Sequence, residues 1–567
     1  MKSSAGTAAH DPHAPASAAG SAGPPAAVRL LRFATDPLER LLDRIYGSKW
    51  NPFYQSGNLA VLAFLVCLAS GLVLFLWYHI ADPHGSVRAI QESLPGGAWL
   101  RSLHRYSADL AVVAIAAHTV RKLLQGHTWG PRALAWISGV VLLLVTLFSG
   151  WTGLVMVWDV QGQGIAIAGA RLLDLLPIFS EPISRSFSGE VPPASSFFFM
   201  ALFLHVALPL GLGALLWLHV SRISRPALLP PRPMIRFLLA ALATAALLAP
   251  LDLPPAADLL ALPGVVPTDL FFAFWLPLSH ALSPGAQAAL WLGLLGMLAA
   301  APWWWRPRRA IAVSSVDESH CTGCTHCYQD CPYEAIAMVP RSDLSQSSAL
   351  VARVDPERCV GCGICAASCA PMGVGPAERD GRDQLVAARA YLERYRLKAP
   401  AGPTGREVVL VACRNGALAQ LGAQPGTLAI PGVELYPTGC SGSVHTSVIE
   451  LLVRRGIGGV FVLSCPPRNC YFREGPKWLE ARLEHGRDAA LHPRVDRRRV
   501  AFASLSATET AAIRAAVSAF QRAVAELTPT AEEQPEIAPV CETTALPVLS
   551  EGSEGSELSE MFEVPRG

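Results

Sequence analysis

The sequence predicts a multi-domain protein in which an all-α membrane region comes first, a small α+β domain follows, and an α/β domain comes last. Three observations lead to this prediction. Hydrophobic residues make up 51% of the 567 residues, and the long apolar segments all lie before residue 305. The cysteines, in contrast, gather after residue 313, in segments with the alternating pattern of soluble strands and helices. A chain of this length is expected to form three or four domains.

The membrane region is expected to contain six helices, because six apolar segments approach the length that a bilayer requires. They lie at about 58–79, 104–124, 134–158, 197–221, 235–252 and 286–305. The segment 270–282 is too short to span and is expected to lie along the membrane face. Lysine and arginine gather before the first span and after the second, fourth and sixth. By the positive-inside rule, both termini and the soluble domains then lie on the cytoplasmic side of a cell inner (plasma) membrane.

Composition also predicts the ends of the chain and one class of absent partner. Residues 1–28 are rich in Ala, Pro, Ser and Gly and are expected to form a disordered lead. Residues 506–567 are expected to form a helix followed by an acidic disordered tail. The formal net charge is +2, and no basic tract has interleaved aromatic residues, so a nucleic-acid partner is not expected.

Two histidine pairs with equal spacing stand out in the membrane region. His104 and His118 are fourteen residues apart, as are His205 and His219. Fourteen residues make nearly four helical turns, so both members of a pair lie on one face about 21 Å apart. Two such helices facing each other would hold two stacked hemes through axial imidazoles. Isolated histidines bonded to backbone carbonyls are the alternative, but they do not explain the repeated spacing.

Two glycine pairs have the same spacing. Gly57 and Gly71 lie on the first span, and Gly139 and Gly153 lie on the third. A residue without a Cβ lets a flat macrocycle approach the helix backbone. The coincidence with the histidine spacing therefore supports two heme sites.

The segment from Trp50 to Pro307 resembles the cytochrome b of quinol-oxidising bc-type complexes. The resemblance lies in SGLVLFLWYHIAD, WLRSLHRYSADLAVVAIAAHTVRK, GPRALAWISGVV and GWTGLVMVWD, together with the histidines of the fourth span. It implies a transmembrane diheme four-helix bundle with two heme b groups and two further membrane helices, and it allows a homodimer. It also implies specific ligands: His104 and His205 for the outer heme, His118 and His219 for the inner heme, and Arg101 and Arg121 for the propionates. Either arginine could instead be a membrane-end residue that reaches toward water.

The quinone sites of that family are only partly matched. The family has a Pro-Glu-Trp-Tyr element at its outer quinol site, and the corresponding residues here are Pro267, Thr268, Asp269 and Leu270. Asp269 is the candidate proton acceptor in place of the missing glutamate, with a merely solvated carboxylate as the alternative. The inner quinone site has no clear signature in the sequence.

Eight cysteines form two runs of C-x2-C-x2-C-x3-C. In such runs the fourth cysteine ligates the cluster of the other run. The first 4Fe-4S cluster is therefore assigned to Cys321, Cys324, Cys327 and Cys369, and the second to Cys359, Cys362, Cys365 and Cys331. Zinc would require paired rather than tripled C-x2-C steps. The segment 313–375 resembles a two-cluster bacterial ferredoxin, which implies an α+β ferredoxin-like domain.

Four more cysteines follow in the segment 405–505, where strands are expected to end: Cys413, Cys440, Cys465 and Cys470. Four thiols at one sheet edge could hold a 2Fe-2S cluster, and buried inert cysteines are the alternative. Through GCSGSV and CPPRNCYFREG the segment resembles the delta subunit of methyl-viologen-reducing hydrogenase, although Arg414 and its neighbours lack the extra cysteine that relatives often carry. The resemblance implies an α/β iron–sulfur domain and a heterodisulfide-reductase-like partner.

Together these features predict a membrane-bound oxidoreductase subunit. It would exchange electrons between a soluble iron–sulfur or flavin complex and the membrane quinone, in the order 2Fe-2S, 4Fe-4S, heme, heme, quinone. The direction of flow is open. A membrane anchor and electron relay without quinone turnover of its own is the alternative.

Overall fold

The computed structural model describes residues 26–177, 181–187, 193–221, 226–260, 269–305, 311–342, 348–398, 406–414, 430–506 and 508–527. The chain up to Glu526 is one compact unit. Most of the expected N-terminal lead, the acidic tail, Pro267 and Thr268 lie outside the described residues.

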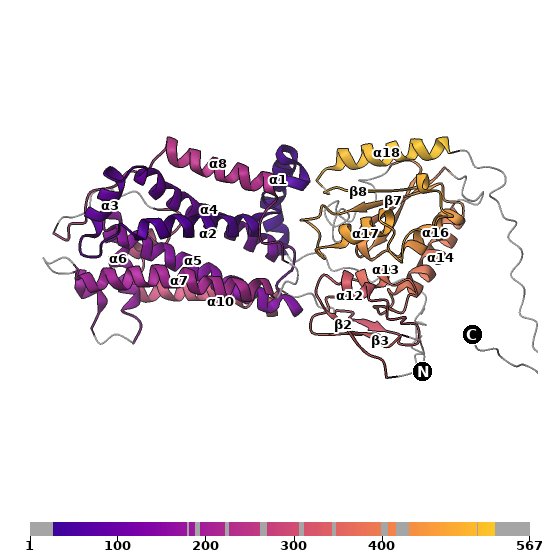
Figure 1. Cartoon of the computed structure of the whole chain (residues 1–567), viewed down its shortest axis with the longest axis horizontal. Coiled ribbons are helices and arrows are strands. Elements are labelled where there is room, and N and C mark those ends of the chain that lie inside the picture. The colour runs from indigo at the N-terminus through magenta and orange to yellow at the C-terminus, as the bar shows by residue number, and fades with distance from the viewer. Residues whose placement is uncertain are drawn as a thin grey trace, which may run out of the picture. The chain divides into compact units, whose positions relative to one another are not determined.

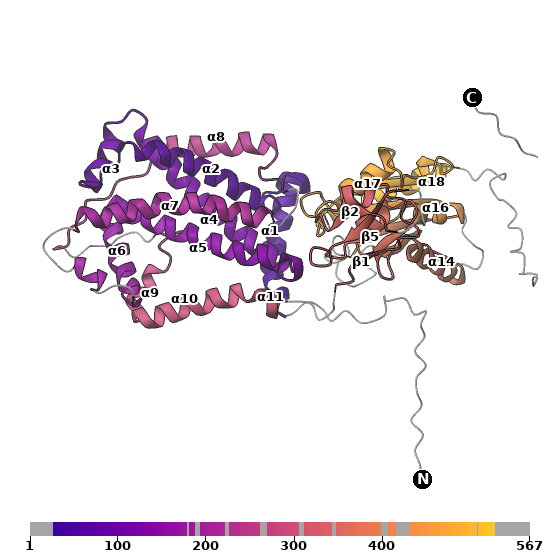
Figure 2. The same ribbon diagram turned by 60° about the horizontal axis from the view of Figure 1, so that its bottom comes forward.

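Helices occur at all six positions where the sequence predicts membrane spans (Figures 1 and 2). They are α2 (Ser56–Phe75), α4 (Gly97–Leu124), α5 (Ala133–Val157), α7 (Ser195–Ser221), α8 (Arg232–Leu248) and α10 (Pro284–Ala299). Helix α2 packs on α4 and α5 packs on α7, while α8 contacts α4 and α10 contacts α5. The α2–α4 and α5–α7 pairs therefore form the centre of the membrane region, with α8 and α10 on opposite sides of it (Figure 2).

Three helical stretches are long and apolar enough to cross a membrane: 56–75, 130–157 and 195–221. Helix α4 has 28 residues but carries charged side chains near both ends. Helices α8 and α10 have 17 and 16 residues, fewer than the roughly 20 that a bilayer requires. The prediction that these last two span the membrane therefore stays a prediction.

Further helices border the membrane region. They are α1 (Ala26–Trp50), α3 (Pro83–Glu92), α6 (Val160–Leu173), α9 (Leu276–Ala281) and α11 (Ala301–Trp304), with 3-10 turns η1 (Gly130–Arg132) and η2 (Ile183–Phe187). Trp158 ends α5 in the left-handed conformation, with φ of 52°, and Asp159 accepts a hydrogen bond from the Gly162 N–H at the start of α6. This tight turn lets α6 pack back against α5, where Trp151 Nε1 donates to the Ile165 carbonyl oxygen at 3.3 Å.

The α+β domain consists of two antiparallel strand pairs and two short helices. Its elements are β1 (Ser314–Val316), α12 (His326–Asp330), β2 (Ile336–Pro340), β3 (Leu350–Val354), α13 (Ile364–Ser368) and β4 (Val374–Pro376). Strand β1 pairs with β4, and β2 pairs with β3. Cysteines supply much of the domain's buried core.

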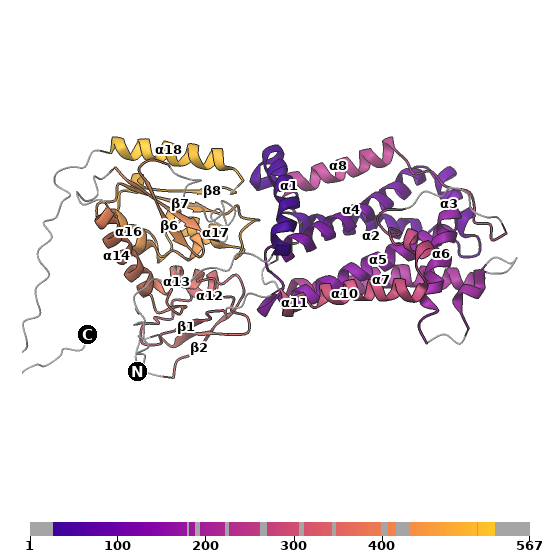
Figure 3. The ribbon, with the colours of Figure 1, turned by 180° about the vertical axis from the view of Figure 1, so that it is seen from behind.

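The α/β domain is built on a parallel sheet with strand order β6-β5-β7-β8. The strands are β5 (Val408–Cys413), β6 (Val433–Thr438), β7 (Gly459–Ser464) and β8 (Val500–Ser504). Helices α14 (Gly381–Lys398), α16 (Thr446–Arg454) and α17 (Gly475–Glu484) pack on one face, and α18 (Thr510–Glu526) packs on the other (Figure 3). The turns η3 (Ser441–Ser443) and η4 (Arg497–Arg499) complete the domain.

The sequence predicts that the α/β domain ends at residue 505, but in the structure the following helix, α18, packs against the sheet. Ile513, Val517, Phe520 and Val524 of α18 are buried against strand residues such as Phe461. These apolar residues recur every three or four positions, so they form one buried helix face. The folded part of the domain therefore includes α18.

Candidate cofactor sites

Two glycines of α2 face two histidines of α4. A Cβ placed on Gly71 would lie 2.7 Å from Cε1 of His104, and a Cβ on Gly57 would lie 2.8 Å from Cε1 of His118. Carbon atoms in ordinary contact are roughly 3.5–4.0 Å apart. Only glycine therefore leaves room for the imidazole rings at these positions.

The helix pair α5–α7 repeats this arrangement. A Cβ on Gly153 would lie 2.8 Å from Cε1 of His205, and one on Gly139 would lie 3.1 Å from Cε1 of His219. Across the bundle, the rings of His104 and His205 face each other with centroids 6.2 Å apart. The structure thus brings together the histidines that the sequence assigned to one heme.

Backbone carbonyls fix which ring nitrogen is free to bind a metal. Nδ1 of His104 lies 2.9 Å from the Cys67 carbonyl oxygen, and Nδ1 of His205 lies 2.8 Å from that of Ser149. Because a carbonyl oxygen only accepts hydrogen bonds, each Nδ1 must carry the proton and donate it. Each Nε2 then keeps its lone pair for a metal, the orientation common in metal-binding histidines.

In the second histidine pair, His118 and His219, not every Nδ1 has a hydrogen-bond partner among the described residues. Nδ1 of His118 is buried with no such partner in the part of the chain that the structure describes, whereas Nδ1 of His219 lies 3.0 Å from Ser138 Oγ. Four neutral imidazoles, each in a recess left by a glycine, fit two heme groups held by axial histidines. The donor set therefore does not conflict with that cofactor.

The two arginines expected to bind propionates are engaged with protein atoms. Arg101 donates to Gln91 Oε1 and to the carbonyl oxygens of Leu251 and Asp252. Arg121 is also engaged: it is 5% exposed and binds two segments that lie outside its own helix. It donates to the Tyr54 carbonyl oxygen at 2.9 Å, to that of Arg468 at 2.8 Å and to Asn469 Oδ1 at 3.0 Å.

Asp269, the candidate proton acceptor, has structural partners on both carboxylate oxygens. Oδ1 accepts hydrogen bonds from the backbone N–H groups of Phe271, Phe272 and Ala273. Oδ2 forms an ion pair with Arg105, and the Asp269 side chain is 8% exposed. These contacts hold the turn that precedes α9. They also leave little of the carboxylate accessible to a quinol.

The eight cysteines of the α+β domain lie in two separate pockets. Cys321, Cys324, Cys327 and Cys369 line one of them, together with Met338 and Val374 among other residues. These four cysteines are the set assigned to the first cluster.

The second pocket contains the other set. It is lined by Cys331, Cys359, Cys362 and Cys365, together with Pro332 and Tyr333 among other residues. Burial raises the pKa of the Cys365 thiol to about 12, so a site without metal would hold a neutral thiol at neutral pH. Metal binding displaces that proton, and a buried set of four thiols fits an iron–sulfur cluster.

Four further cysteines, which form the third cysteine set, converge at the carboxyl edge of the parallel sheet: Cys413, Cys440, Cys465 and Cys470. The thiol of Cys470 lies within hydrogen-bond reach of those of Cys440 and Cys465, and the Cys465 thiol is within such reach of Cys413. Hydrogen bonds from Cys440 and Cys465, and from the backbone N–H groups of Gly475 and Phe472, hold the pKa of Cys470 well below its ordinary value. A Cβ on Gly475 would lie 2.7 Å from the Cys440 sulfur. The four thiols thus fit a compact metal cluster.

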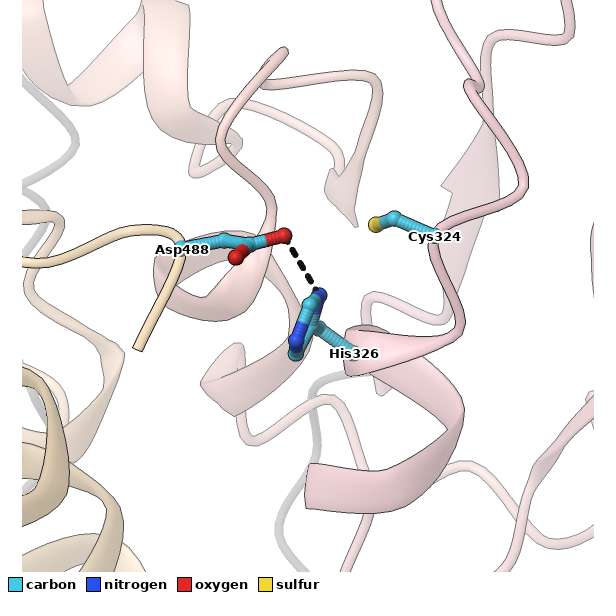
Figure 4. A group of neighbouring side chains, drawn as sticks. All are labelled: Cys324, His326 and Asp488. Atoms are coloured by element: carbon cyan, nitrogen blue, oxygen red, sulfur yellow. Dashed lines mark ion pairs between the residues drawn. The ribbon is translucent and has the colours of Figure 1, made fainter. Parts of the chain in front are cut away.

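Figure 4 shows a further group of potential metal ligands, Cys324, His326 and Asp488. Nδ1 of His326 lies 3.1 Å from Oδ2 of Asp488, as in an ordinary ion pair. Cys324 also lines the first cysteine pocket, together with Cys321, Cys327 and Cys369. This group therefore belongs to the edge of that site.

A polar network that the sequence did not predict surrounds Arg121. Tyr54 donates a hydrogen bond to Glu39 Oε1 at 2.5 Å and also lies 2.9 Å from Asp43 Oδ2. Asn469, which accepts from Arg121, lies next to Cys470. The only sequence signal was the presence of acidic residues within an amphipathic segment before the first span.

Comparisons with known families agree with this division of the chain. Residues 41–226 match cytochrome b/b6/petB. Residues 320–373 match the 4Fe-4S dicluster domain, and residues 408–528 match the delta subunit of methyl-viologen-reducing hydrogenase. A solved structure described as a hyperthermophilic respiratory Complex III is 20% identical, with 44% of this chain and 75% of that chain covered and a TM-score of 0.36. This last likeness by itself carries no functional argument.

The family matches define a membrane electron-transfer protein. More particularly, one polypeptide joins a cytochrome b region, a two-cluster iron–sulfur domain and a hydrogenase-delta-like domain, in the order that the sequence predicts. Cytochrome b implies heme b, and the dicluster domain implies iron–sulfur clusters. The three predicted resemblances are therefore confirmed.

Proposed function

We propose that this chain is an oxidoreductase subunit that exchanges electrons between a soluble iron–sulfur or flavin complex and membrane quinone. A heterodisulfide-reductase-like complex is the proposed soluble partner, in line with the delta-subunit match. When bound, the hemes and iron–sulfur clusters accept and release single electrons. The residues described above hold these groups, exclude water from them and fix their separation. The soluble domains lie on the cytoplasmic side in this proposal, as the distribution of positive charge predicts.

The contact between Asn469 and Arg121 supports this proposal most directly. Asn469 precedes Cys470 of the third cysteine set, and Arg121 lies one helical turn after His118 on α4. The Arg121 guanidinium donates to Asn469 Oδ1 at 3.0 Å and to the neighbouring Arg468 carbonyl oxygen at 2.8 Å. One side chain thus ties a cysteine-bearing loop to a histidine-bearing helix.

A second contact lies near the same end of the bundle. Arg132, which precedes α5, donates to the hydroxyl group of Tyr333, a residue that lines the second cysteine pocket. The ring of Tyr471 also lies 4.7 Å from that of His127, centroid to centroid. We therefore revise the order expected from the sequence, which put the third cysteine set at the partner end. The contacts instead support a place for the loop containing Cys470 next to the membrane helices.

A membrane anchor and electron relay without its own quinone turnover is the second candidate. It is favoured by the contacts of Asp269, since an ion pair and three backbone hydrogen bonds occupy the carboxylate. Under this alternative, Asp269 stabilises the turn before α9 and takes no proton. The replacement Asp269→Asn would then destabilise the protein, and quinol would reduce the hemes of neither the variant nor the wild type.

Optical spectroscopy of the purified protein separates the two candidates. Dithionite-reduced minus oxidised spectra should show b-type bands from two hemes. Quinols of suitable potential should then reduce the oxidised hemes, and a quinone-site inhibitor should suppress or shift this response. If dithionite reduces the hemes but neither quinol nor inhibitor has any effect, the quinone-active function is wrong and the relay function is supported.

A further inference from the structure

Arg482 is a fully buried cation between the cysteine-bearing segments of the soluble region. Its side chain is 0% exposed, on a face of α17 that also buries Leu479 and Leu483. Arginine is among the residues least often buried unless it is paired. Burial lowers the pKa of Arg482 to about 10, so the guanidinium keeps its positive charge at neutral pH.

The hydrogen bonds of Arg482 reach two different cysteine sets. Nη2 donates to the Gly442 carbonyl oxygen at 2.5 Å, two residues after Cys440. Nη1 donates to Ser368 Oγ at 3.2 Å, directly before Cys369. Although Arg482 lies about 10 Å along the helix from the start of α17, helical side chains lean toward the N-terminus. The guanidinium therefore reaches back toward the thiols gathered there.

The protein itself neutralises this charge only in part. The buried carboxylate that interacts with Arg482 is Asp330, next to Cys331. Asp330 already forms an ion pair with Arg487, with 2.5 Å between Nη2 and Oδ1. This carboxylate is thus already paired, and Nε of Arg482 has no hydrogen-bond partner among the described residues. The imidazole of His445 is also nearby, with Nε2 3.2 Å from the Cys369 carbonyl oxygen.

We propose that Arg482 is a positioning residue that raises the reduction potential of the cluster held by the third cysteine set and, through Ser368, of the cluster that includes Cys369. A thiolate-bound cluster is negatively charged and becomes more negative on reduction. A buried cation next to it therefore stabilises the reduced form more than the oxidised form. Net charge and hydrogen bonding are among the factors that set such potentials, and burial preserves the effect against screening by water and salt.

The test is an EPR-monitored redox titration of the full-length protein in detergent. In Arg482→Met, the ratio of reduced to oxidised cluster at a fixed potential should fall on the order of tenfold, which corresponds to about 59 mV for one electron. Arg482→Lys keeps the charge and should stay near the wild-type potential. Arg498→Met is the matched control, because it removes one arginine charge from the same domain at a side chain that is 74% exposed. It should leave both potentials unchanged.

Equal potentials in wild type and Arg482→Met would overturn the inference. A shift in Arg482→Lys as large as that in Arg482→Met would also overturn it. Asp330→Asn provides a test of opposite sign, because removal of this buried carboxylate should raise the potentials. If Arg482→Met does not assemble, Asp330→Asn decides alone, and an unchanged or lower potential in that variant refutes the role of buried charge.

The inference rests on the proposed function, since it requires clusters at these cysteines. Iron and sulfide content and the EPR spectra of the wild-type protein are therefore measured first. Absence of clusters would refute the proposed function. Clusters that are present, with potentials insensitive to Arg482, would refute only this inference.

Discussion

A methyl group added at Gly71 should weaken the binding of one heme and spare the other. The Cβ of Gly71→Ala would lie 2.7 Å from Cε1 of His104, about 1 Å inside the normal carbon–carbon contact distance. Either α2 or the imidazole must move, and overpacking of this kind typically costs about 1–3 kcal/mol. At about 1.4 kcal/mol per tenfold change in affinity, the binding of that heme should weaken from roughly fivefold to more than a hundredfold.

The measurement is the heme-to-protein ratio of the purified protein, with a redox titration of the remaining b-type signal. Gly71→Ala should lower the ratio toward one heme and remove one of the two potentials. Gly57→Ala should remove the other potential, because its Cβ would meet His118. Gly213→Ala is the matched control, since it lies on α7 and a Cβ there meets no atom within 4 Å. Two hemes at unchanged potentials in Gly71→Ala, or equal heme loss in Gly213→Ala, would refute the reasoning.

Three further predictions concern the soluble region and the network near Arg121. Cys321→Ser should abolish the EPR signal of one 4Fe-4S cluster and leave the other, and loss of both or neither would contradict the assignment. Asn469→Ala removes a hydrogen bond to a charged group, of roughly 1.5–3 kcal/mol. It should slow heme reduction by electrons from the soluble side in stopped-flow experiments, at unchanged cofactor content, and an unchanged rate would count against this contact. Burial raises the pKa of Glu39 above its ordinary 4.5, so folding takes up a proton between the unfolded and folded pKa values and stability falls as pH rises through that window. In thermal unfolding against pH, Glu39→Gln should flatten this dependence, whereas a slope equal to that of the wild type would show that other groups cause it.

The sequence was most informative where function depends on local spacing. The interval from His104 to His118 places both rings on one helix face whatever surrounds the helix, because helical geometry is regular. The same reasoning applies to Gly57 and Gly71, which the structure places against those histidines. Buried strands such as β7 were also predictable, because a continuous apolar run between polar segments is typical of a parallel sheet. The extent of the α/β domain was less predictable, since the packing of α18 on the sheet depends on residues far away in the chain.

Side chains with more than one potential partner could not be assigned from the sequence. The propionate role of Arg121 stays a prediction, and its hydrogen bonds to Tyr54, Arg468 and Asn469 could not be foreseen. Asp269 was considered as a proton acceptor, and in the structure it holds a turn and pairs with Arg105. Long polar side chains reach several ångströms in many directions, so their partners are set by whichever segments fold next to them.

The sequence by itself determined the order of the three regions, the histidine and glycine spacing, and the membership of the cysteine runs. Each of these depends on covalent distance along the chain or on helical periodicity, which tertiary contacts hardly alter. Only the tertiary structure decided that the loop containing Cys470 contacts α4 and that Arg482 lies between two cysteine sets. These contacts join residues up to several hundred positions apart, and they form because burial of apolar surface brings the segments together and leaves their polar groups to find partners there.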